Sequence, residues 1–351
     1  MSDVLALARP EIRALDPYQH APWDPSLERL HANESPWRLD GDATRAGLNR
    51  YPEPYAFEVE RALAQVYGVA PEQVLAGRGS DEAIDLLTRG FCAAGRDAVL
   101  VCPPTFGMYK VSARIQGAEV VERPLLRERG WALDADAVLA SLDPRIKLVY
   151  VCTPNNPTGN DTDPTTLLAL AEALSGRALL VVDEAYVEFA GRPSVAGQLG
   201  AHENLVVLRT LSKAFALAGA RCGALLAAPS IVELLRKMIQ PYALPTPTQE
   251  AVLAALEPAA VTMARARIER IVEERARLAA ALGRLRLVTR VWPSAANFLL
   301  VESSAPTRTV EAARRAGFLL RDFEKTIPGA LRITVGSPEQ ADRLLAGLER
   351  A

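Results

Sequence analysis

The chain has 351 residues, of which 49% are hydrophobic and 23% are charged. This composition is typical of a folded protein and excludes a largely disordered chain, and the length favours a large domain with a smaller companion. Forty basic residues against 42 acidic ones leave a formal net charge of -2, so charge gives no reason to expect a nucleic-acid or membrane-surface partner.

The four cysteines and three histidines give no pattern typical of a disulfide framework or a metal site. The cysteines are far apart, with no C-x-x-C pair and no histidine at metal-binding spacing, so we expect reduced thiols, a cytoplasmic protein and no metal site. The first residues lack the basic and apolar segments of a secretory signal. No apolar run approaches the ~18 residues that a membrane span needs.

Periodicity divides the first 100 residues into two parts. Residues 1–50 are rich in proline, tryptophan and polar residues and show little periodicity, which predicts an arm or extended strap. From Glu53 the spacing of apolar residues predicts helices over 57–66 and 81–91, with a glycine-rich turn at 77–80 between them.

Short apolar runs then alternate with helical patterns. Runs without polar alternation are typical of strands buried on both faces. They lie at 98–102, 148–152, 178–182 and 205–208. Spans such as 164–174 are long enough for crossover helices, so the sequence predicts an α/β fold with a mainly parallel central sheet sandwiched by helices.

Beyond Pro241 the pattern changes to long helices and a smaller α+β unit. Helical periodicity covers 249–256 and 261–282, strands are predicted at 288–292, 297–301 and 331–335, and a last helix at 338–348. We therefore divide the chain into three segments. Residues 1–45 form the N-terminal arm and part of the small domain, residues 46–245 the large domain, and residues 246–351 the small C-terminal domain.

Reactive polar residues follow the predicted strands, at the edge where parallel sheets bind their ligands. They are Asn156, Asp183, Tyr186, Lys213 and, eight residues further on, Arg221. A lysine can form an imine with an aldehyde, a carboxylate can hold a ring nitrogen protonated, and amide and phenol groups can bond a phenolate oxygen. The set predicts a site for an anionic, electron-poor aromatic ligand that carries a carbonyl group.

A phosphate group on such a ligand has a predicted position as well. Arg221 offers a guanidinium fork, and the turn at Gly79 opens a helix whose first backbone N–H groups have no partner within the helix. The two features together favour an anion site beside Lys213.

Several motifs spread over the chain carry a family resemblance. They are LDPY at 15–18, ANE at 32–34, NRYP at 49–52, RGSDE at 78–82, PPTFGMY at 103–109, residues 210–223 and LRITVG at 331–336. The chain resembles fold-type I pyridoxal-phosphate enzymes of the aspartate aminotransferase superfamily and, more narrowly, the histidinol-phosphate aminotransferases. The resemblance implies a pyridoxal 5'-phosphate cofactor and transamination between L-histidinol phosphate and 2-oxoglutarate, giving imidazole acetol phosphate and glutamate in histidine biosynthesis.

The resemblance also implies a role for each matching position. Lys213 would bind the cofactor covalently and then act as general base and acid, and Asp183 would pair with the protonated ring nitrogen. Asn156 and Tyr186 would bond the ring oxygen, while Phe106 would stack on the ring.

The remaining implied positions bind the cofactor phosphate and the substrate. Ser80, Asp81, Thr210, Ser212 and Arg221 would surround the phosphate, and Tyr51 would reach the phosphate of the neighbouring subunit, which implies a homodimer. Arg332 would bind the glutamate carboxylate, with Arg321 and Asn33 nearby and Tyr18 at the substrate entrance. Arg332 and Arg321, in one wall of the substrate site, would bind either an amino-acid carboxylate or a phosphate.

Read singly, these residues have ordinary explanations. A lysine after a strand is usually a solvated charge, Asp183-Glu184 resembles a helix cap, and Arg321 and Arg332 could be structural ion-pair partners. Tyr18 and Tyr109 could be packing aromatics.

Alternative functions also remain open at this point. One is an aminotransferase for aromatic amino acids, because Phe106 stands where many relatives have tyrosine and residues 35–37 and 323–329 depart from the family pattern. A second is a pyridoxal-phosphate-dependent decarboxylase of an amino-acid phosphate. A third is a non-catalytic effector module of a transcription regulator, for which the chain shows no DNA-binding segment.

Overall fold

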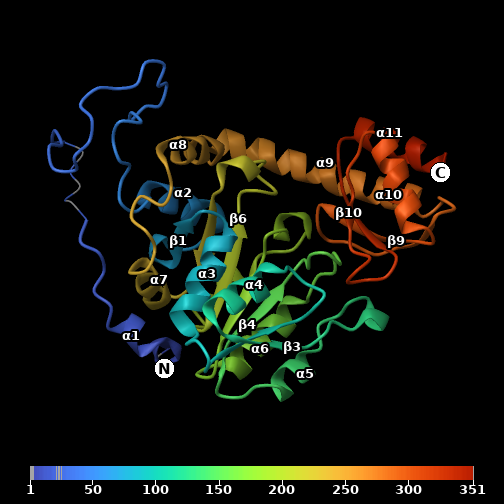
Figure 1. Cartoon of the computed structure of the whole chain (residues 1–351), viewed down its shortest axis with the longest axis horizontal. Coiled ribbons are helices and arrows are strands. Elements are labelled where there is room, and N and C mark those ends of the chain that lie inside the picture. The colour runs from blue at the N-terminus through green and yellow to red at the C-terminus, as the bar shows by residue number, and fades with distance from the viewer. Residues whose placement is uncertain (1–3, 21, 23, 25, 351) are drawn as a thin grey trace.

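The computed structural model describes residues 4–20, 22, 24 and 26–350 (Figure 1). Residues 1–3, part of the segment searched for a secretory signal, lie outside the described residues. Within the described part of the chain, no helix is both long and apolar enough to cross a membrane.

A seven-stranded sheet forms the centre of the large domain. Its strands are β1 (Val74–Gly77), β2 (Ala98–Val101), β3 (Glu119–Glu122), β4 (Ile146–Cys152), β5 (Leu179–Asp183), β6 (Leu205–Thr210) and β7 (Gly223–Leu226), in the order β1-β7-β6-β5-β4-β2-β3. Strands β2 to β6 pair in parallel, and β7 is antiparallel to both of its neighbours. The mainly parallel sheet predicted from the sequence is confirmed.

Helices cover both faces of this sheet. They are α2 (Phe57–Tyr67), α3 (Ser80–Phe91), α4 (Met108–Gln116), α5 (Ala135–Ala140), α6 (Pro164–Leu174), α7 (Pro229–Arg236) and α8 (Thr246–Ala255). Along β5, Leu180 and Val182 enter one core with α6, while Leu179 and Val181 enter the other with α3 and α7. Both faces of the strand are buried, which explains why its sequence is apolar without alternation.

The second sheet is smaller and antiparallel. It contains β8 (Val288–Val291), β9 (Phe298–Ser303), β10 (Arg321–Asp322) and β11 (Ala330–Thr334) in the order β10-β11-β9-β8. It packs with α9 (Pro258–Leu282), α10 (Pro306–Arg315) and α11 (Pro338–Glu349). Helix α9 runs from the end of α8 to this sheet (Figure 1). Pro258 stands in its first turn, where proline is tolerated, rather than interrupting a longer helix.

The N-terminal segment has two parts. A 3-10 turn (Val4–Leu7) and α1 (Pro10–Arg13) come first, and Val4 and Leu7 are buried in the same core as α3 and α7. From residue 14 to 56 the described residues form neither helix nor strand, and the chain projects from the body at the upper left of Figure 1. Leu30 is 94% exposed and Trp37 is 79% exposed. This projecting part offers apolar side chains that its own chain does not cover.

Four strands were not predicted from the sequence. β1 and β7 are short and contain alanine and glycine, so they lack the β-branched run that identified the others. β3 lies at the edge of the large sheet and ends in glutamates, and β10 has only two residues. Their strand conformation comes from pairing with neighbours rather than from local preference.

Candidate active site

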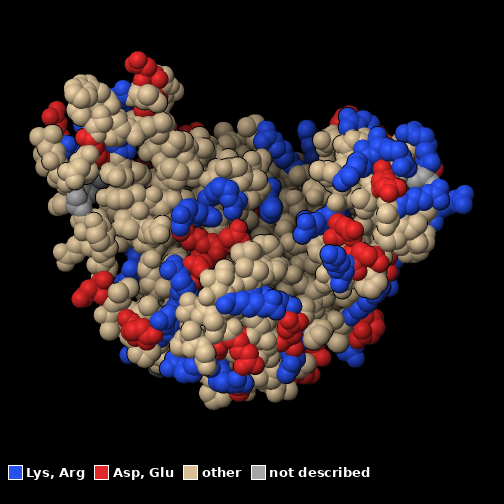
Figure 2. All heavy atoms as spheres, viewed as in Figure 1, with Lys and Arg blue, Asp and Glu red and all other residues tan. Residues whose placement is uncertain are grey.

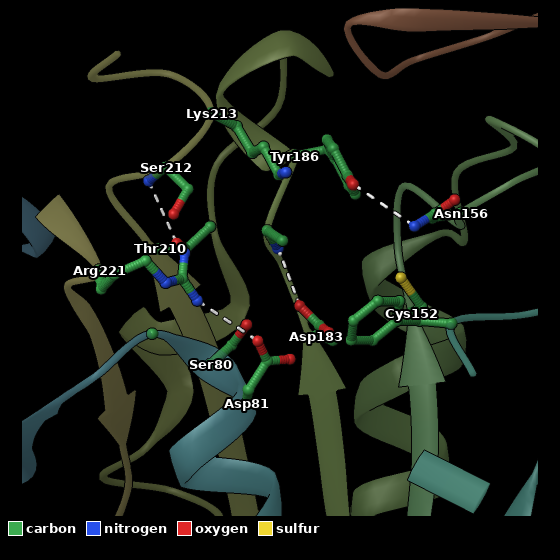
Figure 3. A pocket seen from close by; sticks show the side chains of 13 residues that line it. Ser80, Asp81, Cys152, Asn156, Asp183, Tyr186, Thr210, Ser212, Lys213 and Arg221 are labelled. Atoms are coloured by element: carbon green, nitrogen blue, oxygen red, sulfur yellow. Dashed lines mark hydrogen bonds and ion pairs between the residues drawn. The ribbon is translucent and has the colours of Figure 1, made fainter. Parts of the chain in front are cut away.

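A pocket lies at the carboxyl ends of β4, β5 and β6 (Figure 3). Its lining combines aromatic and apolar side chains with converging polar groups, as ligand pockets do. It is lined by Gly79, Ser80, Asp81, Phe106, Cys152, Asn156, Asp183, Ala185, Tyr186, Thr210, Ser212, Lys213 and Arg221. The structure thus brings together every predicted cofactor residue except Tyr51.

The first turn of α3 forms one wall of the pocket. Gly79 precedes the helix with φ 86°, and no side chain caps the helix start. A Cβ on Gly79 would lie 3.0 Å from Arg221 Nη2, and a Cβ on Gly223 would lie 2.9 Å from Gly79 Cα. The two glycines therefore allow the backbone, the guanidinium group and the helix start to meet closely, as an anion cradle requires.

The loop after β6 supplies the opposite wall of this cradle. Thr210 ends the strand, and its Oγ1 accepts a hydrogen bond of 3.1 Å from the Ser212 backbone N–H. Arg221 adopts a left-handed conformation with φ 54°. Its Nη2 lies 3.4 Å from Asp81 Oδ2, so the side chain points toward the start of α3 (Figure 3). Hydroxyl, guanidinium and helix-start N–H groups thus converge on one volume.

Lys213 reaches into the pocket from the same loop (Figure 3). Its side chain is accessible from the open side of the pocket, and its Nζ lies 5.9 Å from the centre of the Tyr186 ring. Partial burial lowers the pKa of Lys213, and the positive charges of Arg332 and Arg221 lower it further, whereas Asp81 and Asp183 oppose the shift. A lysine with a lowered pKa has more of the neutral amine that attacks an aldehyde or accepts a proton.

Asp183 ends β5 and is 3% exposed. Its Oδ1 accepts a hydrogen bond of 3.1 Å from the Ala185 N–H, and its Oδ2 accepts one of 2.6 Å from the Tyr109 hydroxyl. Burial raises the pKa of Asp183 to about 6, although both hydrogen bonds act to lower it. The carboxyl group is thus held in a fixed orientation in a place where its charge needs a cationic partner.

Asn156 and Tyr186 meet on the other side of the pocket. Asn156 Nδ2 donates to the Tyr186 hydroxyl over 3.5 Å (Figure 3), and Arg332 donates a short hydrogen bond to Asn156 Oδ1. Tyr186 also packs edge-on against Phe298 of β9. Burial raises the pKa of Tyr186, so its hydroxyl stays protonated and can donate to a ligand oxygen. These contacts join the pocket to the small domain.

The two predicted substrate arginines are neighbours in the small sheet. Arg321 on β10 lies directly opposite Arg332 on β11, and side chains at paired positions extend from the same face of a sheet. Their guanidinium groups lie 5.9 Å and 5.6 Å from the Phe323 ring centre. Burial lowers the pKa of Arg332, and the charge of Arg321 adds to the effect. Two cations close together favour an oxyanion between them.

Three other predicted residues lie in a separate cluster near the arm. Asn33 and Tyr51 line a second pocket together with Tyr242. Tyr51 stacks on Tyr242 with ring centres 4.7 Å apart, and Tyr18 influences the same ring electrostatically. Tyr18 and Tyr51 are 70% and 51% exposed. In this chain these residues do not line the pocket that contains Lys213.

Sequence reasoning missed two residues of the pocket region. Cys152 lines the pocket, and Tyr109, expected to be a packing aromatic, does pack but also donates to Asp183. Tyr109 lies in the first turn of α4, and its ring meets the Phe106 ring edge-on with ring centres 5.6 Å apart. Glu184, read as part of a possible cap, is instead buried and accepts from Ser194 and Arg192.

No group of three or more potential ligands that could hold a metal ion occurs among the described residues. The pocket's polar groups suit pyridoxal phosphate: the N–H groups of the α3 start and Arg221 suit its phosphate, the Asp183 carboxylate its protonated ring nitrogen, and the Lys213 amine its aldehyde. Gly79 and Gly223 also leave the close space that a phosphate cradle needs. Fold and site together define a fold-type I pyridoxal-phosphate enzyme.

The chain belongs to the class I and II aminotransferase family, whose model matches residues 32–348. A histidinol-phosphate aminotransferase of Stenotrophomonas maltophilia (strain R551-3) is 48% identical, covering 99% of this chain and 97% of the relative. The crystal structure of the histidinol-phosphate aminotransferase from Clostridium acetobutylicum shares the fold, with a TM-score of 0.78 at 19% identity over 86% of this chain and 90% of that one.

A third relative supports the cofactor. The histidinol-phosphate aminotransferase from Sinorhizobium meliloti, solved in complex with pyridoxal-5'-phosphate, has a TM-score of 0.75 at 26% identity, covering 86% of this chain and 82% of that one. The protein is an aminotransferase, and its cofactor is pyridoxal 5'-phosphate.

Proposed function

We propose that this aminotransferase transfers the amino group between L-histidinol phosphate and 2-oxoglutarate, giving imidazole acetol phosphate and glutamate, in histidine biosynthesis in the cytoplasm. The observation that carries the proposal is the pairing of Arg321 with Arg332 across β10 and β11. Glutamate brings a second carboxylate and histidinol phosphate brings a phosphate, and a guanidinium fork binds either oxyanion. The 48% identical relative with this printed name supports the same substrates.

Each residue around the pocket has a proposed role in the reaction. Bound pyridoxal phosphate supplies an aldehyde and an electron-withdrawing ring. Lys213 Nζ would take the proton from the substrate's α-carbon and hold it for return, which its lowered pKa favours. Asp183 would keep the ring nitrogen of the bound cofactor protonated, and Asn156 and Tyr186 would hold its ring oxygen.

The phosphate and the ring face are held by the remaining predicted positions. We propose that Ser80, Asp81, Thr210, Ser212 and Arg221 surround the cofactor phosphate and that Phe106 stacks on the ring. Ser80 and Asp81 act mainly through the backbone N–H groups at the start of α3. The convergence of these residues on one pocket supports this assignment.

A two-step spectroscopic assay tests the reaction. The purified protein with its cofactor is mixed with glutamate, and loss of the bound cofactor's absorbance is followed. Imidazole acetol phosphate or phenylpyruvate is then added. We expect imidazole acetol phosphate to restore the absorbance. Restoration by phenylpyruvate alone would instead assign the chain to aromatic amino acids, and carbon dioxide release in place of amino transfer would assign it to a decarboxylase.

We also propose that the active unit is a homodimer in which Tyr51 of each chain reaches the phosphate site of the other. Asn33 and Tyr18 then contribute near the substrate entrance. Two observations support this: Tyr51 does not line its own chain's cofactor pocket, and the neighbouring arm exposes Leu30 and Trp37. In Figure 2, the projecting arm is mostly covered by uncharged side chains, which suits a contact with a second copy.

Hybrid dimers test the position of Tyr51. We expect Lys213→Ala and Tyr51→Ala chains each to be weakly active alone. A mixed dimer contains one site with both defects and one site with none if Tyr51 acts on the partner. We therefore expect mixing, after mild dissociation, to restore activity. No gain on mixing, with mixed dimers shown to be present, would place Tyr51 in its own chain's site.

The domain boundaries stay a proposal. The two separate sheets support a large domain over 46–245 and a small domain over 246–351. The first turn of the arm packs into the large-domain core through Val4 and Leu7, so the contribution of residues 1–45 to the small domain needs a test. Proteolysis that leaves the two sheets intact and cuts near residue 246 would support these limits.

A further inference from the structure

Tyr109 makes a contact that packing alone does not require. Its ring is fully buried between two aromatic neighbours, stacked on Tyr150 at 4.6 Å and met edge-on by Phe106 at 5.6 Å. A phenylalanine would fill this space equally well. The hydroxyl group, however, donates to Asp183 Oδ2 over 2.6 Å. The added oxygen therefore has a partner in the cofactor site.

The direction of this hydrogen bond is fixed by charge. Burial raises the pKa of Tyr109 far above its ordinary value, and the Asp183 carboxylate raises it further, so the phenol stays protonated and donates. The same bond opposes the effect of burial on Asp183 by favouring its charged form. Ala185 N–H holds the other oxygen, so the two bonds fix the plane of the carboxylate.

We propose that Tyr109 is a positioning residue for the amino transfer: its hydroxyl holds Asp183 in the orientation and charge state in which the carboxylate meets the cofactor's ring nitrogen. The inference rests on the proposed role of Asp183. A charged, oriented carboxylate leaves the proton on the ring nitrogen, and a protonated ring withdraws electrons more strongly from the substrate's α-carbon. Tyr109 thus acts through Asp183 and does not itself touch the substrate.

Other titratable groups face Asp183 from the elements packed around it. They are Asp81 on α3, Cys152 and Tyr150 on β4, Glu184 next to it in the chain, Tyr186 beyond β5, and Lys213 after β6. Asp81 and Glu184 disfavour the charged carboxylate, whereas Lys213 favours it. Among the described residues, the Tyr109 hydroxyl is the one side-chain donor to Asp183.

Tyr150 provides a matched control. It is equally buried and stacks on the same ring, but its hydroxyl meets Thr88 Oγ1 at 3.3 Å rather than the carboxylate. Tyr109→Phe and Tyr150→Phe each delete one buried hydroxyl from the same aromatic stack. A merely structural role for Tyr109 predicts similar effects from both, whereas a positioning role predicts an effect on Asp183 from Tyr109→Phe alone.

The first test uses the cofactor-free chain and needs no catalysis. The infrared band of the protonated Asp183 carboxyl is identified by its loss in Asp183→Asn and then titrated with pH. In Tyr109→Phe we expect the midpoint to move to higher pH, with proton binding about tenfold tighter. Tyr150→Phe should leave the midpoint in place. The same midpoint in wild type and Tyr109→Phe would overturn the proposal.

A tyrosine analogue covers the case in which Tyr109→Phe does not fold. A fluorinated tyrosine at position 109 keeps the ring and makes the hydroxyl a stronger donor. The midpoint of Asp183 should then move the opposite way, to lower pH. An unchanged midpoint with a folded chain would count against the proposal.

The second test examines the loaded enzyme. With the natural cofactor, Tyr109→Phe should slow the glutamate half-reaction by roughly 10-fold. With a cofactor analogue that has CH in place of the ring nitrogen, wild type and variant should agree within about twofold, because the group through which Tyr109 acts is gone. An equal loss with both cofactors would overturn the proposal. If wild type itself failed to react with glutamate, the proposed function would fail, while the infrared test would still decide the Tyr109–Asp183 coupling.

Discussion

Within the cofactor pocket, polar side chains meet partners from the same chain, whereas the arm between residues 14 and 52 leaves large apolar side chains open to solvent. Asp183 has bonds to both carboxylate oxygens, and Arg221 lies against Asp81. Trp37 on the arm is 79% exposed. The polar groups of the pocket are thus held in place by the chain itself, whereas the arm exposes apolar surface of the kind that protein contacts use.

The functional residues proposed for this enzyme therefore fall into two groups, those buried in the pocket and those exposed near the arm. In the pocket, burial raises the pKa of Asp183, and burial together with neighbouring positive charge lowers the pKa of Lys213. Tyr51 and Tyr18 on the arm side remain largely exposed. Substitutions in the pocket should therefore change chemistry in every assay, while substitutions at the arm should act only when a second chain is bound.

Loss of the reactive amine tests the pocket most severely. Lys213→Ala should slow the glutamate half-reaction by at least about 10³-fold, because it removes the amine that we propose as general base and as the group that binds the cofactor. Single-turnover absorbance measurements give the rate. Lys147→Ala is the control, since Lys147 lies at the other end of β4 and donates to the Pro144 carbonyl. Comparable losses in both variants would contradict the assignment of Lys213.

Substitution of Arg332 tests whether this arginine of the small domain binds the oxyanion of both substrates. Arg332→Lys keeps the charge but loses the fork, so both half-reactions should slow by roughly 10- to 100-fold. Rates with glutamate and with histidinol phosphate are measured separately. Arg290→Lys is the control, because Arg290 packs on Trp292 in the same sheet without meeting Asn156. Full rates with both substrates in Arg332→Lys would exclude the shared oxyanion site.

The sequence predicted the residues that line the pocket better than the contacts that hold those residues in place. Apolar runs precede Lys213, Asp183 and Arg221 directly or at a short distance in the sequence. Parallel pairing of these strands places their carboxyl ends side by side. The bond from Tyr109 to Asp183 joins residues 74 positions apart, so no local pattern indicates it. The same holds for the pairing of Arg321 with Arg332, because β10 has only two residues and takes its register from β11.

Burial of Asp183 predicts a stability effect in the cofactor-free chain. The folded-state pKa is about 6 against an ordinary 3.8, so the folded chain holds the proton more tightly and its stability falls as pH rises through this window. Asparagine does not titrate. Asp183→Asn should therefore be more stable than wild type above pH 6 by on the order of 1–3 kcal/mol, with the gap closing as pH falls to about 4.

Urea unfolding at several pH values measures this gap. Asp163→Asn supplies a control of opposite sign: the hydrogen bonds that Asp163 accepts from Thr165 at the start of α6 lower its pKa, so its stabilising effect is lost as pH falls. A gap for Asp183→Asn that does not change with pH would contradict the burial of a charged carboxylate at this position.

The smallest expected effect comes from the arm side of the molecule. Tyr51→Phe keeps the stack on Tyr242 but removes the hydroxyl proposed to reach the partner's phosphate site, so cofactor affinity should fall by roughly 3- to 10-fold. Equilibrium titration of the cofactor-free dimer measures it. Tyr242→Phe removes the hydroxyl of the stacked neighbour and should leave affinity unchanged. Equal losses in the two variants would show that the aromatic cluster matters only as packing, and the arm would then serve assembly without completing the site.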